Sequence, residues 1–194
     1  MTAPVPCSPA EAAGRALVIV GRPEPYVLGA GDYTGKSPDL PFTQPRGIVG
    51  CDCWGLAGAW AYKLPRHRPG FNRGAWSTVS DDINCDSAIE DAEHRQDLFE
   101  LAQSPAVGDL LVYPSIRGPD RKRIRIGHVG IITGVPAEWD PATPQYELVE
   151  VVQCQASIRP AIMRGPGRTW ANKSQFRGLR DDSWRTRIVR VKHG

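Results

Sequence analysis

The chain has 194 residues, a length that suits one domain, and its hydrophobic share of 41% excludes a chain that is disordered throughout. The 20 glycines and 18 prolines are typical of short elements joined by many turns rather than of a helical bundle. No apolar run approaches the length of a membrane span, so no contact with a membrane is expected. No signal peptide is expected either, because the apolar run 16–20 is short and no basic segment precedes it.

Charge and cysteine content narrow the function classes further. The net charge is only +3, but the segment after residue 154 contains ten lysines and arginines and only two acidic residues, Asp181 and Asp182. Such a segment would attract an anionic partner, although a solvated basic extension is the simpler interpretation, and no nucleic acid partner is expected. The five cysteines are an odd number and fit no secreted disulfide scaffold, so a catalytic or buried cysteine is expected.

Two helices are expected in the first third of the chain. Ser8 and Glu11 form a capping box, which predicts a helix from Pro9 to about residue 20. Asp52 is a good N-cap residue, so a second helix should begin at Cys53 and reach about residue 64. The many glycines and alanines of this second helix indicate close packing against a flat surface, and we expect that surface to be a sheet.

A loop insertion and a third helix should follow. Residues 66–84 have the composition of a loop. Ser87 and Glu90 form another capping box, which predicts a helix that continues to about residue 103. The apolar stripe of this helix would include Leu98 and Phe99.

The remaining elements are expected to be strands. They cover residues 109–113, 127–133, 146–155 and 186–192. Helices followed by consecutive strands with short connections predict an α+β fold, with helices packed on a central antiparallel sheet. We expect residues 1–194 to form a single domain with a loop insertion near 65–85 and a basic C-terminal extension.

Cys53 is the first candidate for chemistry. A thiol reacts as the thiolate, and an ordinary cysteine is largely protonated at neutral pH. The unpaired N–H groups at a helix N-terminus stabilise a thiolate, and the sequence places Cys53 at such a terminus. The alternative is a buried cysteine that acts only as a small hydrophobic residue.

Four segments suggest a family. PYVLGAG, CDCWGL, GDLLVYP and GHVGIITG occur in this order between residues 25 and 134. Together they resemble the NlpC-type bacterial cell-wall peptidases, a papain-like cysteine peptidase family, over about two-thirds of the chain. The resemblance implies a papain-like NlpC-type fold with the nucleophile at a helix N-terminus.

The resemblance also implies roles for particular residues. Cys53 matches the nucleophile, and Asp52 matches the aspartate that precedes it. His128 matches the general base that takes the thiol proton and later protonates the leaving amine. Tyr26 matches a tyrosine that lines the site and helps to bind the oxyanion. A third polar residue on the next strand should orient the imidazole of His128.

Gln153 is the favoured third member of this triad. An amide oxygen can hold the tautomer of the imidazole, as an asparagine does in papain-like enzymes. Strand alternation puts Gln153 and Gln155 on one face with Val151, so Gln155 is the alternative. Glu150 would qualify only in a different register.

Two residues depart from the family pattern. Trp54 replaces the serine that usually follows the nucleophile, and we expect it to reshape the substrate groove. Cys51 adds a second thiol, which opens the alternative of a structural zinc site. The soft ligands of that site would be Cys51, Cys53, Cys85 and one of His67 or His94. Because C-x-C is tighter than the usual zinc-binding pair, no metal and no other cofactor is expected.

The expected function is therefore a cysteine hydrolase that cleaves amide bonds in peptidoglycan stem peptides, as an endopeptidase or an amidase. With no signal peptide, the protein would be made in the cytoplasm and reach the wall after lysis or delivery, as a phage lysin, a phage-tail component or the cargo of a secretion apparatus. The alternatives are a papain-like amidase or transferase with a non-wall substrate, and a catalytically silent binding module.

Overall fold

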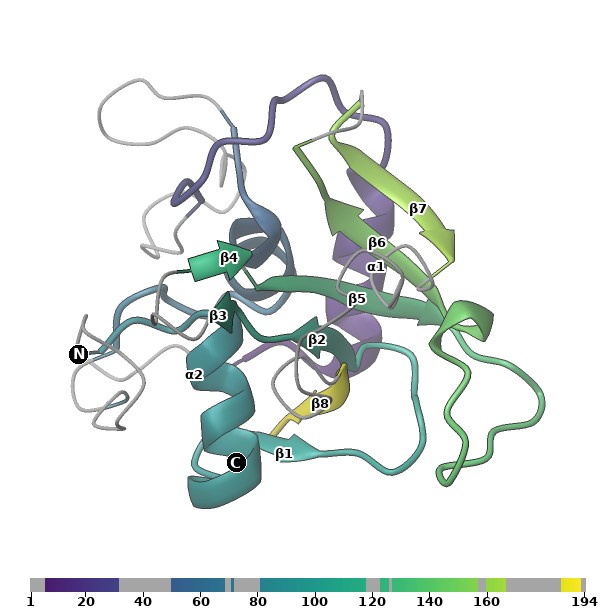
Figure 1. Ribbon diagram of the computed structural model, residues 1–194. Helices are drawn as coiled ribbons and strands as arrows, with labels where there is room; N and C mark the ends of the chain where they lie inside the picture. Colours follow the sequence, from purple (N-terminus) through teal and green to yellow (C-terminus); the bar gives the residue numbers. More distant parts are fainter. Residues whose placement is uncertain are drawn as a thin grey trace.

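The computed structural model of the protein describes residues 6–31, 50–68, 71, 81–117, 123–125, 127–156, 160–166 and 186–192. These residues form an α+β fold around a six-stranded antiparallel sheet, as predicted (Figure 1). The strand order is β1 (Phe99–Leu101), β8 (Arg187–Val191), β2 (Leu110–Tyr113), β5 (His128–Gly134), β6 (Glu150–Cys154) and β7 (Ile162–Pro166). Two short strands, β3 (Ile116–Arg117) and β4 (Arg123–Arg125), pair separately.

The sheet is buried on both faces. Residues such as Val129 and Val152 on one face join the helices in the main hydrophobic core. Leu111 and Val151 on the other face belong to a second, smaller core. The C-terminal strand β8 lies between β1 and β2, so residues 187–191 are an inner part of the sheet. Residues 167–185 of the predicted basic extension lie outside the described residues.

The first helix, α1 (Pro9–Val18), begins as predicted and ends slightly earlier. The Ser8 side chain caps it by accepting a hydrogen bond from the backbone N–H of Glu11 at 3.3 Å. Its buried face consists of the small residues Ala12, Ala13 and Ala16, of which Ala12 and Ala16 belong to the main core. Small side chains let α1 approach the neighbouring elements closely.

The second helix begins at Cys53, but most of it is π-helical rather than α-helical. The π-helical segment η1 spans Gly55–Ala61 and is buried along most of its length. The backbone N–H of Tyr62 bonds to the carbonyl of Ala57 at 3.3 Å, one residue further back than in an α-helix. The sequence did not predict this wider turn, and π-helical turns occur frequently at functional sites.

The third helix differs most from its prediction. It begins as α2 (Cys85–Glu90), continues as the π-helical η2 (Asp91–Arg95) and ends there instead of near residue 103. Asn84, and not Ser87, is the N-cap, with Ser87 completing the capping box. The buried carboxylate of Asp91 accepts the N–H groups of the next turn, including those of Leu98 and Phe99 at 2.9 and 2.8 Å, which directs the chain into β1. Within the described ranges, no helix is long and apolar enough to cross a membrane.

Two other predictions on the C-terminal side need correction. The predicted strand 146–155 begins with a 3₁₀ turn, η3 (Tyr146–Leu148), and only Glu150–Cys154 belongs to a strand. The Tyr146 hydroxyl donates a hydrogen bond to the carbonyl of Thr186 at 2.9 Å, which ties this turn to the residue before β8. Strand β7 was not predicted, because its sequence IMRGP contains glycine and proline. Most of the predicted insertion 66–84 lies outside the described residues.

Candidate active site

Cys53 occupies the first turn of its helix. Oδ1 of Asp52 accepts a hydrogen bond from the backbone N–H of Gly55 at 2.7 Å, which is the N-cap geometry. The N–H of Leu56 bonds to the carbonyl of Asp52 at 3.0 Å and closes the first helical turn. The Cys53 sulfur therefore lies where the partial positive charge of a helix N-terminus is strongest.

Asp52 also fastens the preceding loop to this helix. Its Oδ2 accepts a hydrogen bond from the N–H of Gly29 at 2.8 Å, and its Oδ1 pairs with Arg66 at 2.7 Å. The contact between loop and helix is close, because a Cβ at Gly55 would lie 2.4 Å from the carbonyl oxygen of Ala30. The aspartate thus fixes the position of the nucleophile candidate from two sides.

Tyr26 lies in the same loop. It forms an isolated parallel bridge with Cys51 and packs, partly buried, against the main core. Burial, with a smaller effect of the charges on Cys53 and Asp52, raises the pKa of Tyr26 well above its ordinary value. The phenol therefore keeps its proton at neutral pH and remains a hydrogen-bond donor beside Cys53.

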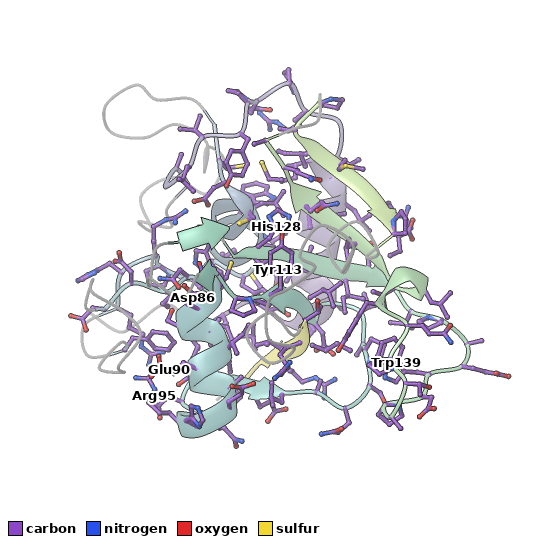
Figure 2. The ribbon with its side chains drawn as sticks, in the orientation of Figure 1. Asp86, Glu90, Arg95, Tyr113, His128 and Trp139 are labelled. Atoms are coloured by element: carbon purple, nitrogen blue, oxygen red, sulfur yellow. The ribbon has the colours of Figure 1, made fainter. Side chains whose placement is uncertain are left out.

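His128 is the first residue of β5 and is 8% exposed. Its Nε2 lies 2.9 Å from Oε1 of Gln153, and its ring packs on Tyr113 with centroids 5.8 Å apart (Figure 2). With Nε2 donating to the amide oxygen, Nδ1 is the nitrogen that can exchange a proton with a sulfur atom.

Gln153 reaches His128 because of the sheet register. It lies opposite Gly130, two residues along β5 from His128, so its long side chain extends diagonally across the pair of strands. Its side chain is fully buried. The buried Oε1 of Gln155, the alternative, has no hydrogen-bond partner among the described residues. Glu150 lies opposite Gly134, at the far end of β5, and pairs with Arg164.

Cys85 is a site residue to which the sequence assigned a role only in the alternative zinc site, and not as a partner of the nucleophile candidate. It is the first residue of α2, and a Cβ on Gly127, next to His128, would lie 2.9 Å from its Cβ. The start of α2 is held there by Asp86, whose Oδ1 accepts a hydrogen bond from the N–H of Ser115 at 2.5 Å (Figure 2). The only signal in the sequence was a cysteine after the N-cap type residue Asn84, which resembles the arrangement of Asp52 and Cys53.

The surroundings of Cys53 favour its thiolate. A hydrogen bond from Cys85 is the largest cause that lowers the pKa of Cys53, and the charge and hydrogen bond of His128 add to it. These contacts outweigh the burial of the sulfur, which acts in the opposite direction. The pKa of Cys85 is raised, because its proton is held by the hydrogen bond to Cys53 and because its thiol is buried. Of the two thiols, Cys53 is therefore the one whose thiolate is favoured.

Trp54 does not line a groove, so the expectation that it reshapes the groove is wrong. The residue is 1% exposed, and its indole meets the ring of Phe99 edge-on with centroids 6.0 Å apart. It also lies over Gly58, where a Cβ would come within 2.4 Å of the indole. The position after Cys53 faces the core, so its bulk is accommodated by a glycine one turn later.

The zinc alternative finds no support in the described residues. Within them no group of three or more His, Cys, Asp or Glu side chains could hold a metal ion. Cys51 instead lies against Cys154, with the sulfur atoms 3.4 Å apart. His67 pairs with Asp82 at 3.2 Å, and His94 is an exposed residue of η2.

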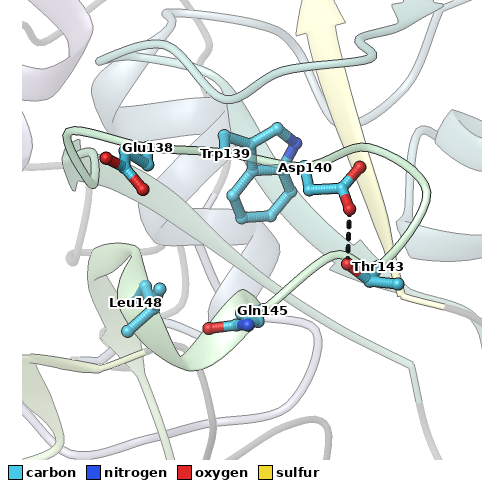
Figure 3. A pocket seen from close by; sticks show the side chains of 6 residues that line it. All are labelled: Glu138, Trp139, Asp140, Thr143, Gln145 and Leu148. Carbon is cyan, nitrogen blue, oxygen red and sulfur yellow. Dashed lines mark hydrogen bonds between the residues drawn. The ribbon is translucent and has the colours of Figure 1, made fainter.

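A pocket of about 330 Å³ lies elsewhere, beyond the other end of β5 (Figure 3). Its lining residues are Glu138, Trp139, Asp140, Thr143, Gln145 and Leu148. Trp139 is far from His128 in Figure 2, and the lining holds no cysteine or histidine. We therefore place the candidate chemistry at the thiol and imidazole rather than at this pocket.

The chain was compared with known proteins in three ways. No protein-family model matches it, and neither a curated protein nor a solved structure does so.

Proposed function

We propose that the protein is a cysteine hydrolase of the NlpC type, with a papain-like fold, that cleaves amide bonds in peptidoglycan stem peptides. One observation carries the proposal. Cys53 lies at a helix N-terminus beside His128, and Nε2 of His128 is hydrogen-bonded to Oε1 of Gln153. A nucleophile, a base and a group that orients the base are the three parts that covalent amide hydrolysis requires.

In the first step, Nδ1 of His128 takes the proton of the Cys53 thiol, and the thiolate attacks the carbonyl carbon of the amide. The negative charge that develops on the carbonyl oxygen is stabilised by backbone N–H groups at the start of the helix. Tyr26 supplies a protonated phenol beside Cys53 and is the candidate for a further donor to this oxygen. Nδ1 of His128 then gives a proton to the departing amine, which leaves an acyl thioester on Cys53.

In the second step, water hydrolyses the thioester. His128 takes a proton from the water, and the free acid leaves as the Cys53 thiolate forms again. Gln153 keeps the imidazole in one tautomer and orientation through both steps, because its Oε1 binds Nε2. Asp52 keeps the helix start, and with it the sulfur, fixed against the loop of Tyr26.

The substrate class comes from the order of the motifs. Segments similar to those around Tyr26, Cys53 and His128 occur in the same order in enzymes that cut stem peptides. The candidate bonds are the amide between γ-D-glutamate and the diamino acid, and the amide between muramic acid and L-alanine.

The test is digestion of purified peptidoglycan by the wild type, Cys53→Ala and Cys7→Ala. Cys7 is a second buried cysteine, whose thiol donates to Glu11, and it serves as the matched control. We expect new amines from the wild type and Cys7→Ala but none from Cys53→Ala, and masses of the released muropeptides that identify the bond. Equal release by Cys53→Ala would refute the proposal. No release by any protein, despite rapid alkylation of Cys53, would refute the wall substrate and favour an amidase or transferase with another substrate.

A further inference from the structure

A second pair of thiols lies behind the candidate site. Sγ of Cys51 lies 3.4 Å from Sγ of Cys154, although 103 positions separate the two residues in the chain. Both side chains are fully buried, and the Cys154 thiol also donates to the carbonyl oxygen of Cys51 at 3.3 Å. This contact joins the segment that leads into the nucleophile helix with the end of β6.

The backbone holds both residues in place. The N–H of Cys51 donates to the carbonyl of Pro25 at 3.3 Å, and the carbonyl of Cys51 accepts from Val27 at 3.0 Å. Cys154 is paired with Ile162 in the ladder between β6 and β7. Sulfur atoms in a disulfide are about 2.05 Å apart, so closure requires a movement of only about 1.4 Å, which side-chain rotation can supply.

We propose that Cys51 and Cys154 form a disulfide bond. The bond would fasten the segment before Asp52 to the strand that carries Gln153, and so would connect the two parts of the candidate site covalently. The inference depends on the geometry of the two thiols and not on the hydrolase proposal.

The reaction needs an oxidant, and a low-molecular-weight disulfide such as oxidised glutathione supplies it. One cysteine thiolate attacks the small disulfide, forms a mixed disulfide and releases one glutathione thiolate. The thiolate of the other cysteine then attacks the protein sulfur and releases the second glutathione. In total the protein loses two thiol protons and two electrons, and the small disulfide is reduced to two thiols.

The folded protein should react slowly by this route. The hydrogen bond to Cys154 and the burial of the thiol raise the pKa of Cys51, so its thiolate is scarce at neutral pH. The pair is also inaccessible to glutathione, because neither side chain is exposed. We therefore expect the bond to form while the chain folds and to resist reduction afterwards.

The experiment refolds the reduced, denatured full chain in a glutathione redox buffer. The product is then unfolded without reductant, alkylated with iodoacetamide and mapped by mass spectrometry of its peptides. We expect alkylation of three of the five cysteines and one linked peptide pair that contains Cys51 and Cys154. Alkylation of all five, or a link from Cys51 to Cys53 or Cys85, would overturn the proposal.

Thermal unfolding provides a second measurement. The disulfide would close a loop of 103 positions and should raise the Tm by on the order of 10 °C relative to the reduced protein. In the wild type and in Cys7→Ala, reductant present during unfolding should lower the Tm of the oxidised protein to that of the reduced protein. Cys154→Ala should show no difference between the two conditions. A shift of the same size in Cys154→Ala would contradict the assignment, and if this variant does not fold, the peptide map of the wild type still decides.

Discussion

Replacement of Cys85 by alanine should make Cys53 harder to ionise. The Cys85 thiol is the largest contributor to the lowered pKa of Cys53, through a hydrogen bond that it donates. Hydrogen bonds to charged groups contribute about 1.5–3 kcal/mol, and a thiol is a weak donor, so the lower end of this range applies. Since about 1.4 kcal/mol corresponds to a factor of ten, the loss of this hydrogen bond should raise the pKa of Cys53 and lower its alkylation rate at neutral pH roughly tenfold in Cys85→Ala.

The assay is the rate at which iodoacetamide modifies Cys53, followed by peptide mass spectrometry over a range of pH. The rate follows the thiolate, so it falls as the pH drops through the pKa of Cys53. In the wild type this fall should occur well below the ordinary thiol pKa of 9.0, because the pKa of Cys53 is lowered. In Cys85→Ala the midpoint should move upwards, towards that of an ordinary thiol.

Two matched variants separate this effect from a general loss of structure. Cys85→Ser keeps a donor at the same position and should retain much of the wild-type profile, whereas Cys7→Ala removes a buried thiol that belongs to α1 and should retain all of it. The reasoning would be refuted if the midpoint stayed in place in Cys85→Ala or if Cys7→Ala moved it equally.

Three further substitutions test the surroundings of the site. Gln153→Leu leaves the Nε2–H of His128 without its acceptor and should lower kcat on peptidoglycan roughly 10–100-fold. Gln155→Leu should leave kcat unchanged, and equal effects of the two variants would contradict the contact between Gln153 and His128. Asp52→Ala removes a helix cap and a partly buried ion pair and should lower the unfolding free energy in urea by about 3 kcal/mol. Asp52→Asn should lower it less, and equal losses would show that the charge of Asp52 does not contribute to stability. Gly58→Ala places a Cβ 2.4 Å from the indole above it and should cost about 1–3 kcal/mol by the same measurement, so an unchanged midpoint would refute this packing.

Part of the arrangement could be predicted because it follows from local patterns. The capping preference of Asp52 placed Cys53 at a helix start, and the structure has the cap that the sequence predicted. Strand alternation put Gln153 and Gln155 on one face of a strand, and the sheet register brings Gln153 to His128. These inferences needed only neighbouring residues and the side-chain period of a strand.

The rest depends on contacts between distant segments. Cys85 reaches the site because α2 is tied to the end of β2, which no local pattern indicates. The third helix was predicted too long, because the sequence does not reveal that buried Asp91 binds the N–H groups of the following turn. The position of Trp54 in the core depends on Gly58, which leaves room for its ring.

The length of β5 has a practical consequence. The strand carries His128 at one end and leads at the other into residues 135–145, most of which are exposed. A reporter domain or an affinity tether inserted in this segment would be attached at the end of β5 away from His128. The protein could thus be immobilised or labelled there for single-molecule work while the candidate site around His128 stays uncovered.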